Sequence, residues 1–252
     1  MAKANFSPVK TRSKPRSDQD FPLLALVRAI LRNDATQVTK CLKQSPDLAW
    51  RHLIVGASRV PETDFYFKEI DHYLYAGDTA LHAAARAYRT DISGILLEHG
   101  ADLKAKNRRG AEPLHYASDG GPGLNSWDPK AQAEMISFLI QAGANPNALD
   151  KSGVAPIHRA VRQRCATAVN ALLDNGAQVR LKNKRGSTPL HLAVQNTGRG
   201  GSGSPEAKSH QQEIIQTLLK RGATPRDRDR KGKTVIECIR ADWIRTSFPK
   251  SF

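Results

Sequence analysis

The chain has 252 residues, and its 39% of hydrophobic and 25% of charged residues are ordinary for a soluble protein. No apolar run approaches the ~20 residues that a membrane-spanning helix requires. The formal net charge is +15, from 39 Lys and Arg against 24 Asp and Glu, so electrostatic attraction favours anionic partners.

Residues 1–20 are basic, polar and without periodicity, which predicts a disordered tail. A polybasic arm for nucleic acid or an anionic surface would have the same composition, and that alternative stays open. Two short helical patterns follow, from Leu23 to Arg32 and from Ala35 to Gln44. Arg28 interrupts the first apolar run, so we expect a helix there and no secretory signal.

A long segment between Leu48 and Gly77 concentrates aromatic residues. Five of the 15 aromatic residues of the chain lie within eleven positions of it. Long ordered loops often carry function and rigid aromatic rings often anchor partners, so Phe65, Tyr66 and Phe67 are candidate contact residues. The alternative is that these rings fold back and close the groove between the first helices and the next structural unit.

One sequence phrase returns at regular steps through the rest of the chain. Its copies begin 33, 43, 33 and 46 residues apart, so two steps carry insertions of 10 and 13 residues beyond a basic step of 33. After each full copy comes an apolar stripe at helical spacing that a Gly-Ala pair closes, which predicts a second helix and its end. Such helix pairs cannot bury their apolar stripes alone and must stack on neighbours. The copies are Thr79–Ala84, Glu112–Ala117, Ala155–Ala160, Thr188–Ala193 and a degenerate Thr234–Glu237.

The Thr-Pro start of the phrase has the chemistry of a helix N-terminus, although Ala80 replaces the Pro in the first copy and Glu112 and Ala155 replace the Thr in the second and third. A Thr side chain can accept a backbone N–H, and the neighbouring Pro has no N–H to leave unpaired. The insertions fall near 119–128 and 198–210, between the two helices of a unit. Asp128 and Pro129 predict the start of the helix after the first insertion. The glycine-rich second insertion lacks the Lys-Ser/Thr ending of a phosphate-binding loop, so we expect a flexible connector.

Histidine occupies the same place in four successive copies. An imidazole there can bridge backbone groups, and this structural role explains the recurrence better than catalysis does. We expect no catalytic residue, no metal ligand and no cofactor. The residues are His82, His115, His158 and His191.

The three cysteines, Cys41, Cys165 and Cys238, lie far apart without metal-ligand spacing. They are interpreted as small buried or half-buried thiols in a reducing compartment. We therefore expect a cytoplasmic protein.

The spacing and the phrase Thr188-Pro189-Leu190-His191 resemble ankyrin repeats. The resemblance covers about 77–240 and, weakly, 21–49, and the motifs are also similar to those of short stand-alone bacterial ankyrin proteins. It implies an all-α solenoid of helix-turn-helix units with hairpin fingers. The implied parts are a basic tail at 1–20, a degenerate N-terminal cap at 21–49, an aromatic-rich inserted finger segment at 50–76, four repeats at 77–233 and a truncated C-terminal cap at 234–252.

Most of the net charge lies in segments that the resemblance assigns to fingers. Lys104–Arg109, Arg180–Arg185 and Arg226–Lys233 carry +4, +4 and +3, and residues 1–20 carry a further +3. In ankyrin proteins the fingers line up along one edge and commonly contact partners. We expect a ridge of one sign, which speeds encounter with an oppositely charged partner. The tip residues, called the basic ridge below, are Arg108, Arg109, Lys151, Lys184, Arg185, Arg230, Lys231 and Lys233.

The exposed face of the first helices is a second surface that the resemblance implies for binding. We therefore expect a non-catalytic protein–protein interaction module that presents the basic ridge to an acidic protein; the oligomeric state is left open. The alternative is salt-dependent, sequence-nonspecific binding of nucleic acid or another anionic surface, although the ridge lacks interleaved stacking aromatics. A third possibility is that the charges only keep the hairpin tips soluble. The helical face would carry Arg86, Asp119, Arg162, Gln163, Gln195 and Asn196.

Overall fold

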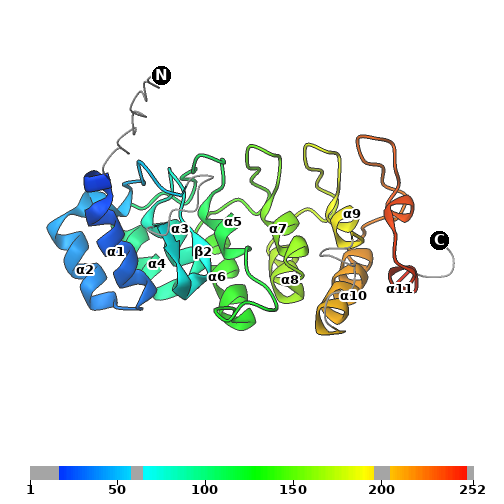
Figure 1. Ribbon diagram of the computed structural model, residues 1–252, viewed down its shortest axis with the longest axis horizontal. Helices are drawn as coiled ribbons and strands as arrows, with labels where there is room; N and C mark the ends of the chain where they lie inside the picture. The colour runs from blue at the N-terminus through cyan, green and yellow to red at the C-terminus, as the bar shows by residue number, and fades with distance from the viewer. Residues whose placement is uncertain (1–16, 58–64, 196–204, 249–252) are drawn as a thin grey trace, which may run out of the picture.

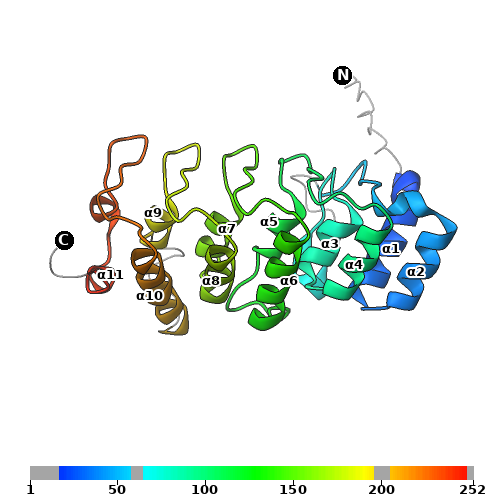
Figure 2. The same ribbon diagram turned by 180° about the vertical axis from the view of Figure 1, so that it is seen from behind.

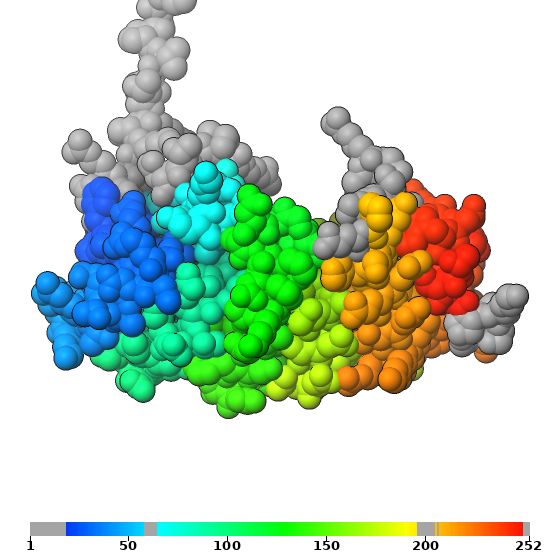
Figure 3. Space-filling view, turned by 90° about the horizontal axis from the view of Figure 1, so that it is seen from below, coloured from blue at the N-terminus to red at the C-terminus, as the bar shows by residue number. Residues whose placement is uncertain are grey.

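The computed structural model describes residues 17–57, 65–195 and 205–248. Over these residues the chain is an elongated stack of helix pairs, with hairpin fingers that project along one edge (Figures 1 and 2). Seen from the side opposite the fingers, the repeats follow one another in chain order along the long axis (Figure 3). The expected all-α repeat architecture is therefore confirmed.

The helix boundaries follow the repeated phrases. The α-helices are α1 (Phe21–Leu31), α2 (Ala35–Gln44), α3 (Ala80–Arg86), α4 (Thr90–Glu98), α5 (Pro113–Ala117), α6 (Pro129–Gln141), α7 (Pro156–Arg162), α8 (Ala166–Asp174), α9 (Pro189–Ala193), α10 (Pro205–Lys220) and α11 (Asp242–Arg245). The described residues also form the short 3₁₀ turns η1 (Ser17–Asp20), η2 (Pro46–Ala49), η4 (Lys68–Ile70) and η5 (Ile236–Cys238), and the strands β1 (Tyr66–Phe67) and β2 (His72–Tyr73).

The apolar stripes of successive helices form one continuous core. On the first helices, the equivalent residues Leu81, Leu114, Ile157 and Leu190 are all 0% exposed. Helix α3 packs between α1 and α5, and α8 packs between α6 and α10. Each repeat therefore buries its apolar face only against its neighbours, as a stacked repeat must.

The recurring histidines join each first helix to the following finger. In each case Nδ1 accepts the backbone N–H of the residue before the helix, at 3.0 to 3.2 Å. The proton must then sit on Nε2, which donates to a carbonyl oxygen of the next finger at 3.0 to 3.3 Å. The bridging role that the sequence predicts is confirmed. The N–H donors and carbonyl acceptors are Thr79 and Ala111 for His82, Glu112 and Val154 for His115, Ala155 and Leu181 for His158, and Thr188 and Lys233 for His191.

The aromatic-rich segment folds back onto the stack. β1 and β2 pair antiparallel, with Tyr66 opposite Tyr73. Phe65 and Phe67 are only 4% and 6% exposed, so the expectation that they form contact surface is wrong. The two rings fill the core because the hairpin turns them inward, whereas Tyr66 is 37% exposed and donates its hydroxyl to Asp71.

The two insertions differ in outcome. At the first, Asp128 caps α6 by accepting the N–H groups of Lys130 and Ala131, both at 3.0 Å, and Pro129 is the first helical residue, as expected. At the second, residues 196–204 lie outside the described part. Residues 205–210 belong to α10, so the connector does not extend to 210 as predicted. A proline at the helix start, with helix-forming residues after it, explains the longer helix.

Candidate protein-binding surface

Each fingertip is the same tight turn built on an Asn or Asp side chain. In the finger before α9, Asn183 Oδ1 accepts the N–H groups of Arg185 and Ser187 at 2.8 and 3.1 Å. An Asn or Asp side chain that bonds backbone groups further along is a well-known stabiliser of turns. The equivalent acceptors in the other fingers are Asn107, Asp150 and Asp229.

Backbone hydrogen bonds connect each fingertip to the next. Their N–O distances range from 2.8 to 3.4 Å. Because the donors are backbone groups, the spacing between fingertips is set by the chain itself and not by flexible side chains. The N–H to carbonyl pairs are Arg108 to Ala76, Lys151 to Arg109, Lys184 to Ser152 and Arg230 to Arg185.

All eight side chains of the basic ridge are exposed. None of the eight forms an ion pair with any residue of the ranges that the structure describes. Two other basic residues of the fingers, Lys106 and Arg180, do form ion pairs. The Arg180 guanidinium donates to both carboxylate oxygens of Asp227 at 3.0 and 2.6 Å, and Lys106 Nζ lies 3.6 Å from Glu112. The fingertips thus carry positive charge that no ion pair with a described residue neutralises.

Tyr75 supports the first pair of ridge arginines. The guanidinium carbons of Arg108 and Arg109 lie 5.0 and 4.3 Å from the centre of its ring. Cation–π contacts of this kind hold arginines over an aromatic face. The sequence placed Tyr75 in the aromatic-rich segment but gave no reason to connect it with the ridge.

An open groove of about 630 Å³ lies at the N-terminal end of the ridge. Its wall carries Trp50 and Ile54, whose exposed fractions of 52% and 57% are large for such side chains. Basic residues of the neighbouring finger, Lys106 and Arg108, line the other side. The exposed aromatic residue of this groove is therefore Trp50, which the sequence does not single out because it stands apart from the aromatic cluster.

The helical face is only partly as expected. Arg86 is 1% exposed, so its expected place on the exposed face is wrong. Arg162 and Gln163 are exposed, and Gln163 donates to the Asp119 carboxylate at 2.9 Å. That carboxylate also accepts from Arg159 at 3.1 Å. Gln195 is exposed, and Asn196 lies outside the described residues.

The titratable groups that recur in the repeats are structural. Burial lowers the pKa of His115 to about 4 and lowers the pKa of His82 and His158. These imidazoles are neutral at pH 7, which their bridging role requires. Among the described residues, no group of three or more His, Cys, Asp or Glu side chains is arranged to hold a metal ion. No helix in the described ranges is long and apolar enough to cross a lipid bilayer.

Stacked helix pairs, a bridging histidine at each helix start and aligned fingers define a repeat protein built for surface contact. Sequence models of ankyrin repeats match residues 26–123, 139–193, and both 109–151 and 185–230, so that together they cover 26–230. The chain belongs to the ankyrin-repeat family. Ankyrin repeats in general mediate protein–protein interaction and are typically non-catalytic.

Two curated human proteins are similar over part of the stack. BCL-6 corepressor-like protein 1 is 44% identical over 50 residues, which are 20% of this chain and 3% of that protein. Ankyrin repeat and SOCS box protein 5 is 35% identical over 78 residues, which are 31% of this chain and 20% of that protein. The match thus spans a small fraction of the length of either relative. Neither likeness bears on the expected similarity to short stand-alone bacterial ankyrin proteins.

Proposed function

We propose that this protein is a non-catalytic interaction module whose basic ridge binds an acidic segment of a partner protein. One observation carries the proposal: eight exposed cations that form no ion pair with the described residues stand on fingers that backbone hydrogen bonds connect one to the next. A preorganised charged surface loses little conformational entropy when a partner binds, and its field speeds encounter.

The groove beside the first finger supplies an apolar contact. Charge alone gives weak specificity, whereas aromatic side chains in pockets dominate the binding energy of many interfaces. Trp50 and Ile54 would receive an apolar side chain of the partner, while Lys106 and Arg108 would pair with acidic residues next to it. The proposed ligand is therefore an acidic segment with at least one large apolar residue.

A protein partner is favoured over nucleic acid by the surroundings of Tyr75. The guanidinium groups of Arg108 and Arg109 both lie over its ring and compete with any base that would stack there. Sequence-nonspecific contact with phosphates needs only the cations. It is the competing outcome in the experiment below.

The proposed location is the cytoplasm. Cys41, Cys165 and Cys238 are all free thiols, and Cys165 is buried. Free thiols persist in reducing compartments. An accessible-thiol assay on protein from cells, with and without reductant, should give the same count.

Affinity capture from a lysate at low salt, with and without nuclease, tests the proposed function. The native chain is compared with a ridge variant that carries Arg108→Glu, Arg109→Glu, Lys184→Glu and Arg185→Glu. A matched control carries Arg32→Glu, Lys40→Glu, Lys43→Glu and Lys130→Glu, which are exposed residues at the end of α1, on α2 and on α6.

The proposal requires a protein that survives nuclease, is retained by the control and is lost from the ridge variant. Loss of all captured material with nuclease would replace it by nucleic-acid binding. Equal capture by the native chain and the ridge variant would make the ridge ordinary solvated surface.

A further inference from the structure

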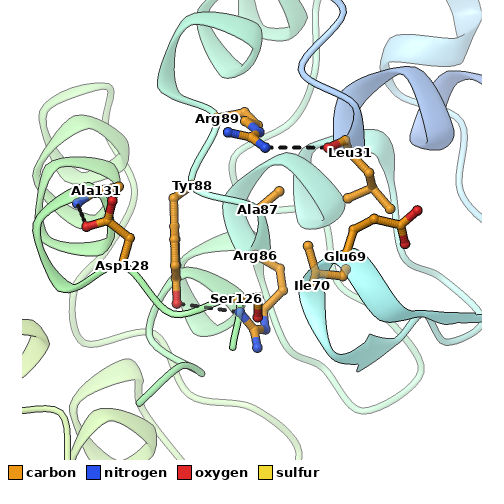
Figure 4. A pocket seen from close by; sticks show the side chains of 10 residues that line it. All are labelled: Leu31, Glu69, Ile70, Arg86, Ala87, Tyr88, Arg89, Ser126, Asp128 and Ala131. Atoms are coloured by element: carbon orange, nitrogen blue, oxygen red, sulfur yellow. Dashed lines mark hydrogen bonds between the residues drawn. The ribbon is translucent and has the colours of Figure 1, made fainter. Parts of the chain in front are cut away.

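Two departures from the regular repeat spacing meet around one buried arginine. Arg86 lies at the end of α3. The aromatic-rich segment contributes Glu69 and Ile70 to its surroundings, and the first insertion contributes Ser126 and Asp128 (Figure 4). Together with the α3–α4 turn they line a cavity of about 250 Å³. By the same measure one water needs only about 15 Å³, so the cavity has room for a small ligand.

The Arg86 side chain forms no direct ion pair with the described residues, and its guanidinium carbon lies 6.0 Å from the centre of the Tyr88 ring. It is 1% exposed, and its hydrogen bond is a long one of 3.5 Å from Nη1 to the Tyr88 hydroxyl. Its Nε is buried without a partner. Burial opposes the shift, but the charges of Arg159 and, more weakly, of Arg86 lower the pKa of Asp119, whose oxygens accept hydrogen bonds from Arg159 and Gln163 and not from Arg86. Burying a cation without a direct ion pair is costly, and a negatively charged group in the cavity next to Arg86 would reduce that cost.

Two more polar atoms of the same cavity are buried without partners. They are Nε of Arg89 and Oγ of Ser126. In Figure 4 the Arg86 side chain extends toward Ser126 and the Tyr88 hydroxyl, whereas Arg89 extends toward Leu31, whose carbonyl it contacts at 3.4 Å. The cavity thus presents the Arg86 guanidinium together with the hydroxyls of Ser126 and Tyr88, and Nε of Arg89 belongs to a residue of its lining.

The two carboxylates that line the cavity, those of Asp128 and Glu69, form no ion pair with Arg86. Asp128 is committed to the N-terminus of α6, where it accepts the Ala131 N–H (Figure 4). Glu69 is exposed and makes no ion pair with the described residues. It is therefore a solvated charge on the lining of the cavity.

We propose that this cavity binds a compact oxyanion of the phosphate class. Arg86 would supply the compensating charge, and Arg89, Ser126 and Tyr88 would supply further hydrogen bonds. Guanidinium groups suit such ligands because their planar set of donors matches two oxygens at once. Water could satisfy single polar atoms of the cavity but would add no negative charge next to Arg86.

Thermal unfolding of the full chain in increasing inorganic phosphate, against chloride at equal ionic strength, tests the proposal. The native chain should show a saturable rise in Tm with phosphate. Arg86→Met should abolish that rise and, without phosphate, should unfold at a higher temperature than the native chain, since it removes an unpaired buried charge. Arg162→Met, on the exposed side of α7, should respond as the native chain does. The ridge variant should also keep the response, which separates this proposal from the proposed function.

A second pair of variants tests the proposal even if Arg86→Met does not fold. Ser126→Ala removes one hydroxyl and should bind phosphate at least about threefold more weakly. Glu69→Gln removes a negative charge that would repel the anion, so this variant should bind phosphate more tightly than the native chain. If Glu69 were the counter-ion of Arg86, the same variant would be less stable and would bind no more tightly.

Comparison of inorganic phosphate with a short phosphoserine peptide identifies the source of the anion. Tighter binding of the peptide points to a phosphate carried by a partner, and equal or weaker binding points to a free anion. The proposal is overturned if neither ligand gives a saturable rise in Tm, or if Arg86→Met responds as the native chain does.

Discussion

Gly186 and Gly232 occupy the same place in two fingertip turns, but of the two only Gly186 lies against the backbone of the next finger. Both have a left-handed backbone, with φ of +74° and +78°. A Cβ on Gly186 would lie 2.5 Å from the backbone N of Arg230, whereas a Cβ on Gly232 would meet no described atom within 4 Å. The two glycines therefore separate backbone strain from the close approach of neighbouring fingers.

We predict that Gly186→Ala destabilises the protein more than Gly232→Ala. Both substitutions incur about 1 to 2 kcal/mol of left-handed strain, and Gly186→Ala adds about 1 to 3 kcal/mol of overpacking and disturbs the bond between Arg185 and Arg230. Urea unfolding of the two variants measures the difference. Equal losses of stability would mean that the fingertips are not held together as described.

Because His115 is buried and neutral, we predict that the free energy of unfolding falls in mild acid. Burial lowers the pKa of folded His115 to about 4, while an unfolded His titrates near 6.5. Between these values the unfolded chain binds the proton and the folded chain does not, so the free energy of unfolding decreases as pH falls. Full titration of this one residue corresponds to about 3 kcal/mol.

Urea midpoints of the native chain at about pH 7.5 and about pH 5 measure this effect. His115→Gln should be less stable at the higher pH, since it disturbs the bridge from Glu112 to Val154, but it should lose less stability on acidification. An unchanged pH dependence in this variant would show that the imidazole is not held neutral.

At the scale of the helix, Ala155 marks a missing cap. The equivalent Thr188 accepts the His191 N–H at the start of α9, whereas Ala155 has no side-chain oxygen for α7. We predict that Ala155→Thr stabilises the protein by about 1 kcal/mol and that Thr188→Ala destabilises it by a similar amount. Hydrogen exchange in α7 and α9 locates both effects. A destabilising Ala155→Thr would mean that the buried site has no room for the added atoms.

In each of the two repeats that carry an insertion, a buried glutamine joins the second helix to the end of the first. Gln132 Nε2 donates to the Ala117 carbonyl at 2.9 Å, and Gln211 Nε2 donates to the Ala193 carbonyl at 2.6 Å. Both glutamines lie in the second helix of a repeat with an insertion, and both bond the end of its first helix. The insertion lengths are visible in the sequence, but these ties are not, because glutamine in a helix normally indicates an exposed position.

Local rules explain which elements the sequence could predict. Caps, prolines and helical stripes depend on near neighbours, so α1, α2 and the starts of α5 to α7 and α9 follow from the phrases that contain them. The burial of Arg86 depends on the hairpin at 65–76 and on the insertion before α6, which are distant in sequence. Phe65 and Phe67 turn inward for the same reason, and the exposure of Trp50 depends on the neighbouring finger.

At the scale of the whole molecule, the stack is a rigid support that repeats one fingertip along an edge (Figure 1). The helix pairs bury the apolar residues, the histidines join helices to fingers, and the finger-to-finger bonds fix the spacing of the charges. A partner with acidic groups at matching spacing would meet several cations at once. Its affinity should therefore fall steeply with salt.

The dissociation constant of a purified captured partner, measured at several salt concentrations, tests this account most directly. The native chain and the control with Arg32, Lys40, Lys43 and Lys130 changed to Glu should bind alike, and added salt should weaken both. The ridge variant should bind at least about tenfold more weakly at low salt and should depend less on salt. Equal affinities of the native chain and the ridge variant would contradict the account.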